Sequence, residues 1–396
     1  MAGLYLHIPF CEHKCVYCDF YSIESLDPID EFTAALRTEI GMYAFQNDEP
    51  FDTIFFGGGT PSLLAPRTVG RIIELLAGTF TVSPEAEVTL EANPGTVDEQ
   101  KLRELRRAGV NRLSFGVQSF HDDDLKFLTR IHDANQARQA ITMARAAGFD
   151  NVSLDLIFSL PGQTPERWEA NLRAALALAP DHLSCYSLIV EQGTPLHRMV
   201  ESKQVSTLPV EDDARLFERT AEVLAVAGYE QYEVSNFALP GRRSRHNAGY
   251  WNHSNYLGFG PSAHSFWGRR RWWNVANLRT YLEKVGAGVA PLAGEEELLD
   301  DGALADDGLG ELGLDLGAVV GVNAEERQLF AHAGLGDVEH QVEVLPELFL
   351  NGLSCLVVEL NLGQTESLPD SVGSLEAFIT LEMAQLALVS QDEQVE

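Results

Sequence analysis

Three cysteines near the start of the chain have the type and spacing of ligands to an iron–sulfur cluster. Cys11, Cys15 and Cys18 lie in the run HIPFCEHKCVYCDF, which gives the pattern C-x3-C-x2-C. A cluster of four irons and four sulfides that only transfers electrons normally has a protein ligand on every iron, so three thiolates leave one iron open. Because an open iron can bind a small molecule, the triplet predicts a [4Fe-4S] cluster with a ligand site.

Two other uses of these cysteines compete with the cluster. A structural zinc site needs a fourth Cys or His at a suitable distance, and His7 and His13 keep that alternative open. Disulfide bonds fit less well, because the opening residues MAGLYLHIPF have neither the basic nor the apolar segment of a secretory signal. We therefore expect a cytoplasmic protein.

The rest of the composition agrees with a reducing compartment. The chain has 396 residues and five cysteines, which is typical of cofactor binding and not of a disulfide framework. Cys185 and Cys355 each lie in an apolar run, where a free cysteine is usually a small buried hydrophobic residue. No stretch approaches the roughly 20 apolar residues of a membrane span, so we expect none.

Charge is unevenly distributed along the chain. There are 28 basic and 59 acidic residues, and from Pro291 onward the single basic residue is Arg327, against 23 acidic ones. Because phosphate binding needs a basic surface, this balance argues against a nucleic-acid partner. One basic and aromatic cluster could be either a solvated surface or an anion site: Arg242, Arg243, Arg245, Arg269, Arg270, Arg271, Trp272 and Trp273.

Short β-rich runs alternate with amphipathic helical patterns over residues 1–235. This alternation predicts an α/β fold with a parallel sheet and right-handed crossovers, and its regularity favours a partial (β/α)6 barrel over an open sheet. Strands are expected at Leu4–Ile8, Thr53–Phe56, Glu87–Glu91, Arg112–Gln118, Asn151–Ile157 and His182–Val190. Helices are expected at Asp30–Ala44, Pro66–Ala77, Asp98–Ala108, Ala134–Ala147, Pro165–Leu178 and Glu211–Ala227, with Gly109, Gly148 and Gly228 placed to end three of them.

Polar groups stand at the carboxyl ends of the expected strands, where parallel barrels keep their reactive residues. In strand order they are the cysteine loop, Gly57–Pro61, Glu91, Gln118, Asp155 and Ser187. We therefore expect a single site at the mouth of the barrel. The glycines let a backbone approach a ligand closely. Glu91 and Asp155 can accept hydrogen bonds from an amine or a ribose diol, and Gln118 and Arg130 can bind a carboxylate or the sugar.

A set of longer motifs links the chain to a known family. The motifs are LYLHIPFC, YCDF, FFGGGTPSLL, LEANPGT, GVNRLSFGVQSF, LTRIH, NVSLDLIFSLPGQT, YEQYEVSNFA and HNAGYW. In these the sequence resembles the radical S-adenosylmethionine (SAM) superfamily, its coproporphyrinogen dehydrogenase-like branch and, within that branch, the heme chaperone family HemW. The resemblance implies that SAM occupies the open iron. It also implies a cofactor site formed by Tyr5, Tyr17, Gly59, Thr60, Glu91, Gln118, Arg130, Asp155 and Ser187.

Two members of this branch share the fold and the cluster. Oxygen-independent coproporphyrinogen oxidases carry a fourth cysteine, in YCxC, where this chain has Phe20. The heme chaperones lack that cysteine and carry HNxxYW, which stands here at residues 246–251. The resemblance implies that His246 is an axial heme ligand, with nearby arginines pairing with the heme propionates. Without the resemblance, a histidine in a loop is more often a hydrogen-bonded structural residue.

We predict a barrel at 1–235, an extension with the HNxxYW motif at 236–290, and a smaller acidic C-terminal module at 291–396. This module matches none of the family motifs, and its fold does not follow from the sequence. The expected function is that of a heme chaperone delivering heme to apoproteins, with membrane respiratory enzymes as acceptors by resemblance. The alternatives are a coproporphyrinogen III oxidase of porphyrin biosynthesis and a zinc-binding interaction protein.

Overall fold

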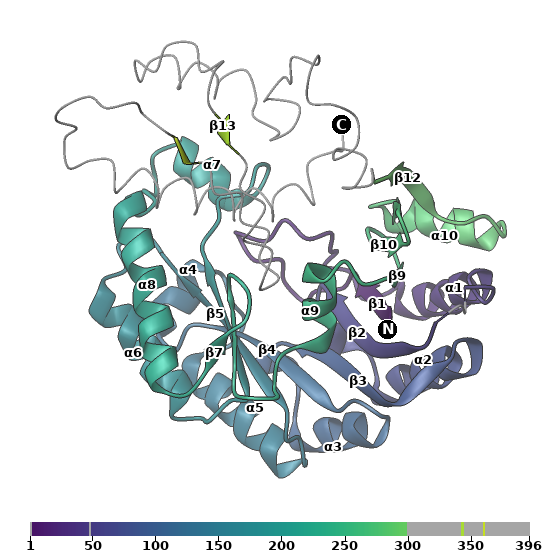
Figure 1. The fold of residues 1–396 in the computed structure, drawn as a ribbon, viewed down its shortest axis with the longest axis horizontal. Coiled ribbons are helices and arrows are strands. Elements are labelled where there is room, and N and C mark those ends of the chain that lie inside the picture. Colours follow the sequence, from purple (N-terminus) through teal and green to yellow (C-terminus); the bar gives the residue numbers. More distant parts are fainter. Residues whose placement is uncertain (1, 47–48, 299–341, 344–358, 361–396) are drawn as a thin grey trace. The chain divides into compact units, whose positions relative to one another are not determined.

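The computed structural model describes residues 2–46, 49–298, 342–343 and 359–360. The chain divides into two compact units, Met1–Leu298 and Leu299–Glu396. The first unit contains a sheet with the strand order β12-β11-β10-β9-β1-β2-β3-β4-β5-β6-β8-β7. Strands β1 to β6 pair in parallel in chain order: β1 (Ala2–Ile8), β2 (Phe51–Gly58), β3 (Val82–Ala92), β4 (Arg112–Gln118), β5 (Val152–Phe158) and β6 (His182–Ser187). Figure 1 shows helices around the outside of this curved sheet, which confirms the predicted partial (β/α)6 barrel.

Three of the outer helices end just before the predicted glycines Gly109, Gly148 and Gly228, which all have positive φ. The outer helices are α1 (Ile29–Met42), α2 (Pro66–Thr79), α3 (Glu99–Arg107), α5 (Ala134–Ala146), α6 (Pro165–Leu176) and α8 (Val210–Val226). Asp98 caps α3 by accepting a hydrogen bond from the amide of Lys101 at 2.8 Å. Asp133 and Gln136 form a capping box at the start of α5.

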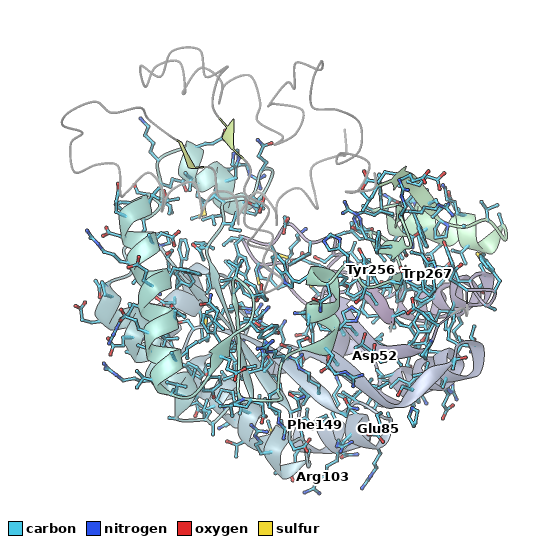
Figure 2. All side chains as sticks on the ribbon, viewed as in Figure 1. Asp52, Glu85, Arg103, Phe149, Tyr256 and Trp267 are labelled. Atoms are coloured by element: carbon cyan, nitrogen blue, oxygen red, sulfur yellow. The ribbon has the colours of Figure 1, made fainter. Side chains whose placement is uncertain are left out.

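Alternating side chains of the parallel strands face the helices and the barrel interior. Leu4, Leu6 and Ile8 of β1 are fully buried in the apolar core that the strands share with the helices. The side chains of the interior face are mostly polar, and they tolerate burial because they bond to one another. His182, for example, bonds to Ser153 at 2.7 Å and to the Tyr232 hydroxyl at 2.8 Å. Figure 2 shows side chains in the region that the curved sheet encloses.

Strand β6 is shorter than predicted. It ends at Ser187, whereas the sequence favoured a strand through Val190. Residues 188–190 are apolar, as a strand would be, but they belong to the rim of the barrel, where Leu188 packs against Leu128 and Leu160. Four short elements were not predicted from the sequence: α4 (Asp122–Phe127), α7 (Pro195–Glu201), and the 3-10 turns η1 (Pro61–Leu63) and η2 (Pro94–Thr96).

Residues 230–297 extend the sheet at both of its edges. Their elements are β7 (Glu230–Gln231), β8 (Asn236–Ala238), α9 (Arg245–Trp251), β9 (Tyr256–Phe259), β10 (His264–Trp267), β11 (Arg270–Asn274), α10 (Leu278–Gly286) and β12 (Leu292–Glu297). Strand β8 pairs antiparallel with β6, and β9 pairs parallel with β1. The chain therefore crosses from one edge of the barrel to the other, and α9 lies in that crossing.

A buried carboxylate joins this extension to the first helix. Glu39 of α1 accepts hydrogen bonds from the hydroxyl of Tyr281 at 2.7 Å, the side-chain amide of Asn274 at 2.6 Å and the amide of Gly260 at 2.8 Å. Burial raises the pKa of Glu39 to about 7, although all three donors oppose that shift. The contact connects α1 with β9, β11 and α10.

In the second unit, β13 (Val342–Glu343) pairs antiparallel with β14 (Glu359–Leu360). Cys355 and most of the predicted acidic module lie outside the described residues. Among the helices that are described, none is long and apolar enough to cross a membrane.

Candidate functional site

The three cysteines lie together in the loop that follows β1, and all are free thiols. Cys11 and Cys15 are buried, and Cys18 is half-buried. The loop is pinned at its base, because the amide of Cys11 donates to Ile23 at 2.9 Å. In the described parts of the chain, no three His, Cys, Asp or Glu side chains surround a single metal-ion position. A four-iron cube binds each thiolate at its own iron, so its ligands do not have to converge on one point.

The glycine run after β2 packs directly against the cysteine loop. Gly59 donates its amide to Ile8 at 2.9 Å, and Thr60 donates its amide to Phe10 at 2.7 Å. A Cβ at Gly59 would lie 2.7 Å from the Phe10 carbonyl oxygen, so only glycine fits there. The hydroxyl of Thr60 also donates to the sulfur of Cys11 at 3.5 Å. The cysteine loop after β1 and the glycine run after β2, which were predicted from separate strand ends, are therefore in contact.

Glu91 and Asp155 place two carboxyl groups on the interior face near this loop. Burial raises the pKa of Glu91 to about 8, and the charge of Asp155 adds to that effect. Burial likewise raises the pKa of Asp155 to about 6, opposed by a hydrogen bond from the Ser114 hydroxyl at 3.1 Å. Two carboxyl groups that resist ionisation form a site suited to a cationic ligand.

Gln118 and Arg130, two more of the predicted residues, lie on the same side of the sheet as the cysteine loop. Gln118, at the end of β4, has a φ of 65°, and Thr129 and Ser159 have φ values of 54° and 60°. Left-handed backbone is uncommon outside glycine and often marks functional sites. The side chain of Arg130 reaches the sulfur of Cys15, with 3.4 Å between Nη1 and Sγ.

Ser187 contacts Asp213, a residue that the sequence did not indicate as part of the site. Its hydroxyl donates to a carboxylate oxygen of Asp213 at 2.7 Å, and the hydroxyl of Ser159 donates to the same oxygen. Asp213 lies in the first turn of α8, where an acidic residue is common for the helix dipole alone. The local sequence pattern therefore does not show whether Asp213 only stabilises the start of the helix or also forms hydrogen bonds at the mouth of the barrel.

The two histidines near the cysteines have other partners. His7 donates Nε2–H to the Tyr21 carbonyl at 2.8 Å and, since burial lowers its pKa to about 4, it is neutral and accepts from the Tyr5 hydroxyl at Nδ1. His7 therefore fixes the cysteine loop and orients Tyr5. His13 lies 3.1 Å from Glu24 on the surface.

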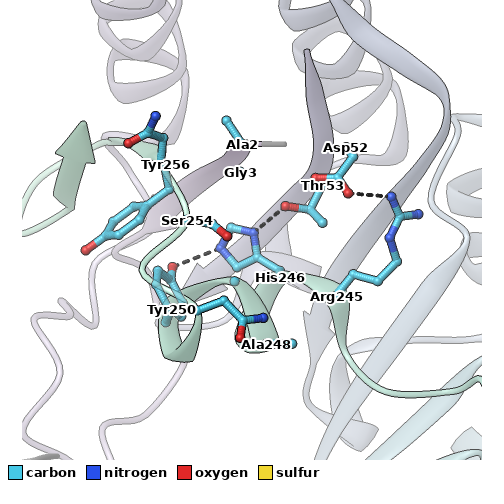
Figure 3. Close-up of a pocket in the computed structure, with 13 residues that line it drawn as sticks. Ala2, Gly3, Asp52, Thr53, Arg245, His246, Ala248, Tyr250, Ser254 and Tyr256 are labelled. Carbon is cyan, nitrogen blue, oxygen red and sulfur yellow. Dashed lines mark hydrogen bonds and ion pairs between the residues drawn. The ribbon is translucent and has the colours of Figure 1, made fainter. Parts of the chain in front are cut away.

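His246 lies in a different place from the cysteines. It lines a pocket of about 300 Å³ together with Ala2 and Gly3, at the amino end of β1 (Figure 3). The cysteine loop follows the carboxyl end of the same strand. Hydrogen bonds join its Nδ1 to the Thr53 hydroxyl at 2.8 Å and its Nε2 to the Tyr250 hydroxyl at 2.9 Å. Both ring nitrogens are therefore occupied in this conformation.

The ring of His246 is also enclosed by aromatic side chains. It stacks on Phe55 and on Tyr5, with ring centroids 5.0 and 6.3 Å apart. Burial lowers the pKa of His246 to about 3, so the ring is neutral at physiological pH. A neutral imidazole beside aromatic rings has the chemistry of a heme ligand and equally that of a packed interior residue.

The basic and aromatic cluster forms two separate sets of ion pairs. On the β11–β12 ladder, Arg270 pairs with Glu295, and Arg271 lies 3.2 Å from Glu296. Around α9 and the loop before it, the pairs are Arg242 with Asp181, Arg243 with Glu230 and Arg245 with Asp52. Of the two interpretations, these pairs favour the solvated surface, because an anion would have to displace a carboxylate at each of these five arginines.

Comparison with known proteins places this fold and site in a class. Residues 5–175 match the family profile of the Radical SAM superfamily. Among solved structures, coproporphyrinogen III oxidase (HemN) from Escherichia coli, described as a radical SAM enzyme, matches with a TM-score of 0.66 and 26% identity, covering 75% of this chain and 72% of that one. The barrel with three thiols at its mouth is thus that of a radical SAM protein.

The curated relatives narrow the class further. Heme chaperone HemW from Bacillus subtilis is 40% identical over 289 residues, 72% of this chain and 76% of that protein. Heme chaperone HemW from Mycobacterium tuberculosis CDC 1551 is 38% identical over 341 residues, 85% of this chain and 87% of that protein. The chain belongs to the HemW family. Superfamily membership implies a [4Fe-4S] cluster and SAM, and the free thiols and close-packed glycine at the mouth fit both.

Proposed function

We propose that this protein is a heme chaperone that holds a [4Fe-4S] cluster and SAM at the barrel mouth, binds heme and delivers it to apoproteins. One observation carries the proposal. In a chain of the HemW family, the position that would complete YCxC is Phe20, whose side chain is 60% exposed on the cysteine loop. We further propose that the protein acts in the cytoplasm and that its acceptors include membrane respiratory enzymes.

The mouth residues have distinct proposed tasks. Cys11, Cys15 and Cys18 would hold the cluster, and the backbone at Gly59 and Thr60 would line the SAM site. Tyr5, Tyr17, Gln118, Arg130 and Ser187 are proposed to complete that site. When bound, the cluster and SAM supply one-electron chemistry. Glu91 and Asp155 would accept hydrogen bonds from the cationic part of SAM, which stabilises their ionised forms against the burial that opposes them.

SAM affinity should depend on the ionisation of Glu91. Since the pKa of Glu91 is raised to about 8, a cation must displace its proton at lower pH, so the contribution of Glu91 should grow as pH rises towards 8. Glu91→Gln should weaken binding by about tenfold or more near pH 8, since a charged hydrogen bond contributes about 1.5–3 kcal/mol. The difference from wild type should shrink towards pH 6.

Equilibrium binding of SAM to both proteins from pH 6 to 9 tests this. Titration of SAM itself is common to the two and cancels in the comparison. Asp155→Asn should also weaken binding, and iron content should be unchanged in both variants. A ratio of affinities that does not vary with pH would remove the proposed role of Glu91.

A second candidate function is oxidative decarboxylation of coproporphyrinogen III, favoured by the likeness to coproporphyrinogen III oxidase. One sample decides between the two. Anaerobically reconstituted protein is titrated with heme, mixed with an apoprotein acceptor, and assayed with coproporphyrinogen III, reductant and SAM. We expect heme binding and transfer and no protoporphyrinogen. Formation of protoporphyrinogen would overturn the chaperone proposal, and zinc in place of iron and sulfide would overturn the cluster.

A further inference from the structure

The guanidinium of Arg130 is held rigidly beside one of the three thiols. Its Nη2 donates to the Gly116 carbonyl at 2.7 Å and to the side-chain oxygen of Asn93, while Nη1 lies 3.4 Å from the sulfur of Cys15. A Cβ at Gly116 would lie 3.1 Å from Nη2, so the glycine makes room for the guanidinium. The position of this charge is therefore fixed by two strand ends.

A second donor reaches the same sulfur. The Tyr17 hydroxyl lies beside this sulfur and interacts with both Cys15 and Arg130. A hydroxyl from the cysteine loop itself and a cation from a distant part of the chain thus approach the same sulfur.

In the part of the chain that the structure describes, the other two thiols receive hydrogen bonds from neutral donors only. The sulfur of Cys11 receives the Thr60 hydroxyl at 3.5 Å, and that of Cys18 receives the backbone amide of Phe20. Among the described hydrogen bonds, no arginine or lysine donates to either sulfur. The environment of the triplet is therefore asymmetric, because Arg130 bonds directly to the sulfur of Cys15, whereas Lys14 acts on Cys18 through its charge alone.

We propose that Arg130 and Tyr17 set the reduction potential of the cluster through the sulfur of Cys15. The couple is [4Fe-4S]²⁺ plus one electron giving [4Fe-4S]⁺, with the electron supplied by a reductant in solution. The added electron increases the negative charge on the thiolates, so a cation and a hydrogen-bond donor stabilise the reduced form more than the oxidised form and raise the potential. The inference rests on the proposed cluster and is independent of heme.

Potentiometric titration of the reconstituted full-length protein tests the proposal. The reduced cluster is followed by its electron paramagnetic resonance signal, without SAM, so that a lost SAM contact cannot contribute. Arg130→Met should make reduction at least tenfold less favourable, which for a one-electron couple is 59 mV more negative. Tyr17→Phe should shift the potential in the same direction by less, and Arg130→Lys should lie between wild type and Arg130→Met.

A matched control removes an arginine of the outer surface. Arg103 of α3 lies on the outside of the barrel (Figure 2). It pairs with Glu99, and Arg103→Met should leave the potential unchanged. Wild-type potentials in Arg130→Met and Tyr17→Phe proteins with full iron content would overturn this inference alone. If Arg130→Met protein cannot hold a cluster, the potential of Tyr17→Phe protein is the test: a more negative value supports the inference, and a wild-type value overturns it. Wild-type protein without iron and sulfide would instead overturn the proposed cluster.

Discussion

Anaerobically reconstituted Cys15→Ala protein should contain no [4Fe-4S] cluster, whereas wild type should contain about four irons per chain. Two thiolates cannot hold three irons of the cube. The loss is made worse because the substitution leaves Arg130 and the Tyr17 hydroxyl without the sulfur that they approach. Iron and sulfide analysis, together with the visible absorption of the cluster, measures the effect.

The chain offers a matched control for this substitution. Cys185 is a free thiol on β6 and is 2% exposed, as expected for a small hydrophobic residue. Cys185→Ala should lose some stability and keep its full iron content, because this thiol lies outside the cysteine loop. Full iron in Cys15→Ala, or its loss in a folded Cys185→Ala protein, would contradict the assignment of the triplet.

The barrel could be predicted because its signals are local. The six parallel strands and the six outer helices each carry their own periodicity, some of these helices also carry a cap, as Asp98 does for α3, and the repeat alone selects the parallel sheet. The edges of the sheet could not be predicted in the same way. Strand β9 pairs Tyr256 with Gly3, and no local pattern specifies a pairing over that separation.

The residues of the candidate site likewise fall into those that the sequence could indicate and those whose roles depend on tertiary contacts. Residues near the carboxyl ends of the strands, such as Glu91 and Gln118, could be proposed for the site because the topology brings those ends together. Asp213 and His7 were missed in their observed roles, because those roles consist of hydrogen bonds to Ser187, Tyr5 and Tyr21. A sequence shows which residue types are available, and tertiary structure decides which of them meet.

The sequence left two interpretations of His246 open, an axial heme ligand and a hydrogen-bonded structural residue. The structure shows what each interpretation requires. Its ring is 4% exposed, and its nitrogens bond to Thr53 and Tyr250. The adjoining pocket of about 300 Å³ is at the low end for a ligand site. Binding of heme to Nε2 therefore requires that α9 shifts and that the Tyr250 hydroxyl gives up its bond.

This requirement gives opposite expectations for two neighbouring substitutions. If His246 ligates heme, His246→Ala should weaken heme binding by about tenfold or more, as loss of support at a metal site typically does. Tyr250→Phe should strengthen it, by up to roughly tenfold, because the competing hydrogen bond contributes about 0.5–1.5 kcal/mol. If His246 is only a structural residue, both substitutions remove the same hydrogen bond and should act alike.

Heme titration followed by the Soret band, on samples matched for iron and sulfide, separates these outcomes. The cluster signal should be intact in both variants, because the cysteine loop and the His246 pocket lie at opposite ends of β1. Thr53→Val, which removes the partner of Nδ1, controls for loosening of the ring. Wild-type heme affinity in His246→Ala would move the ligand elsewhere and leave the chaperone function standing. Weaker binding in Tyr250→Phe would assign the HNxxYW motif to packing of the barrel interior, because a tyrosine that competes with heme for Nε2 cannot also be needed to bind it.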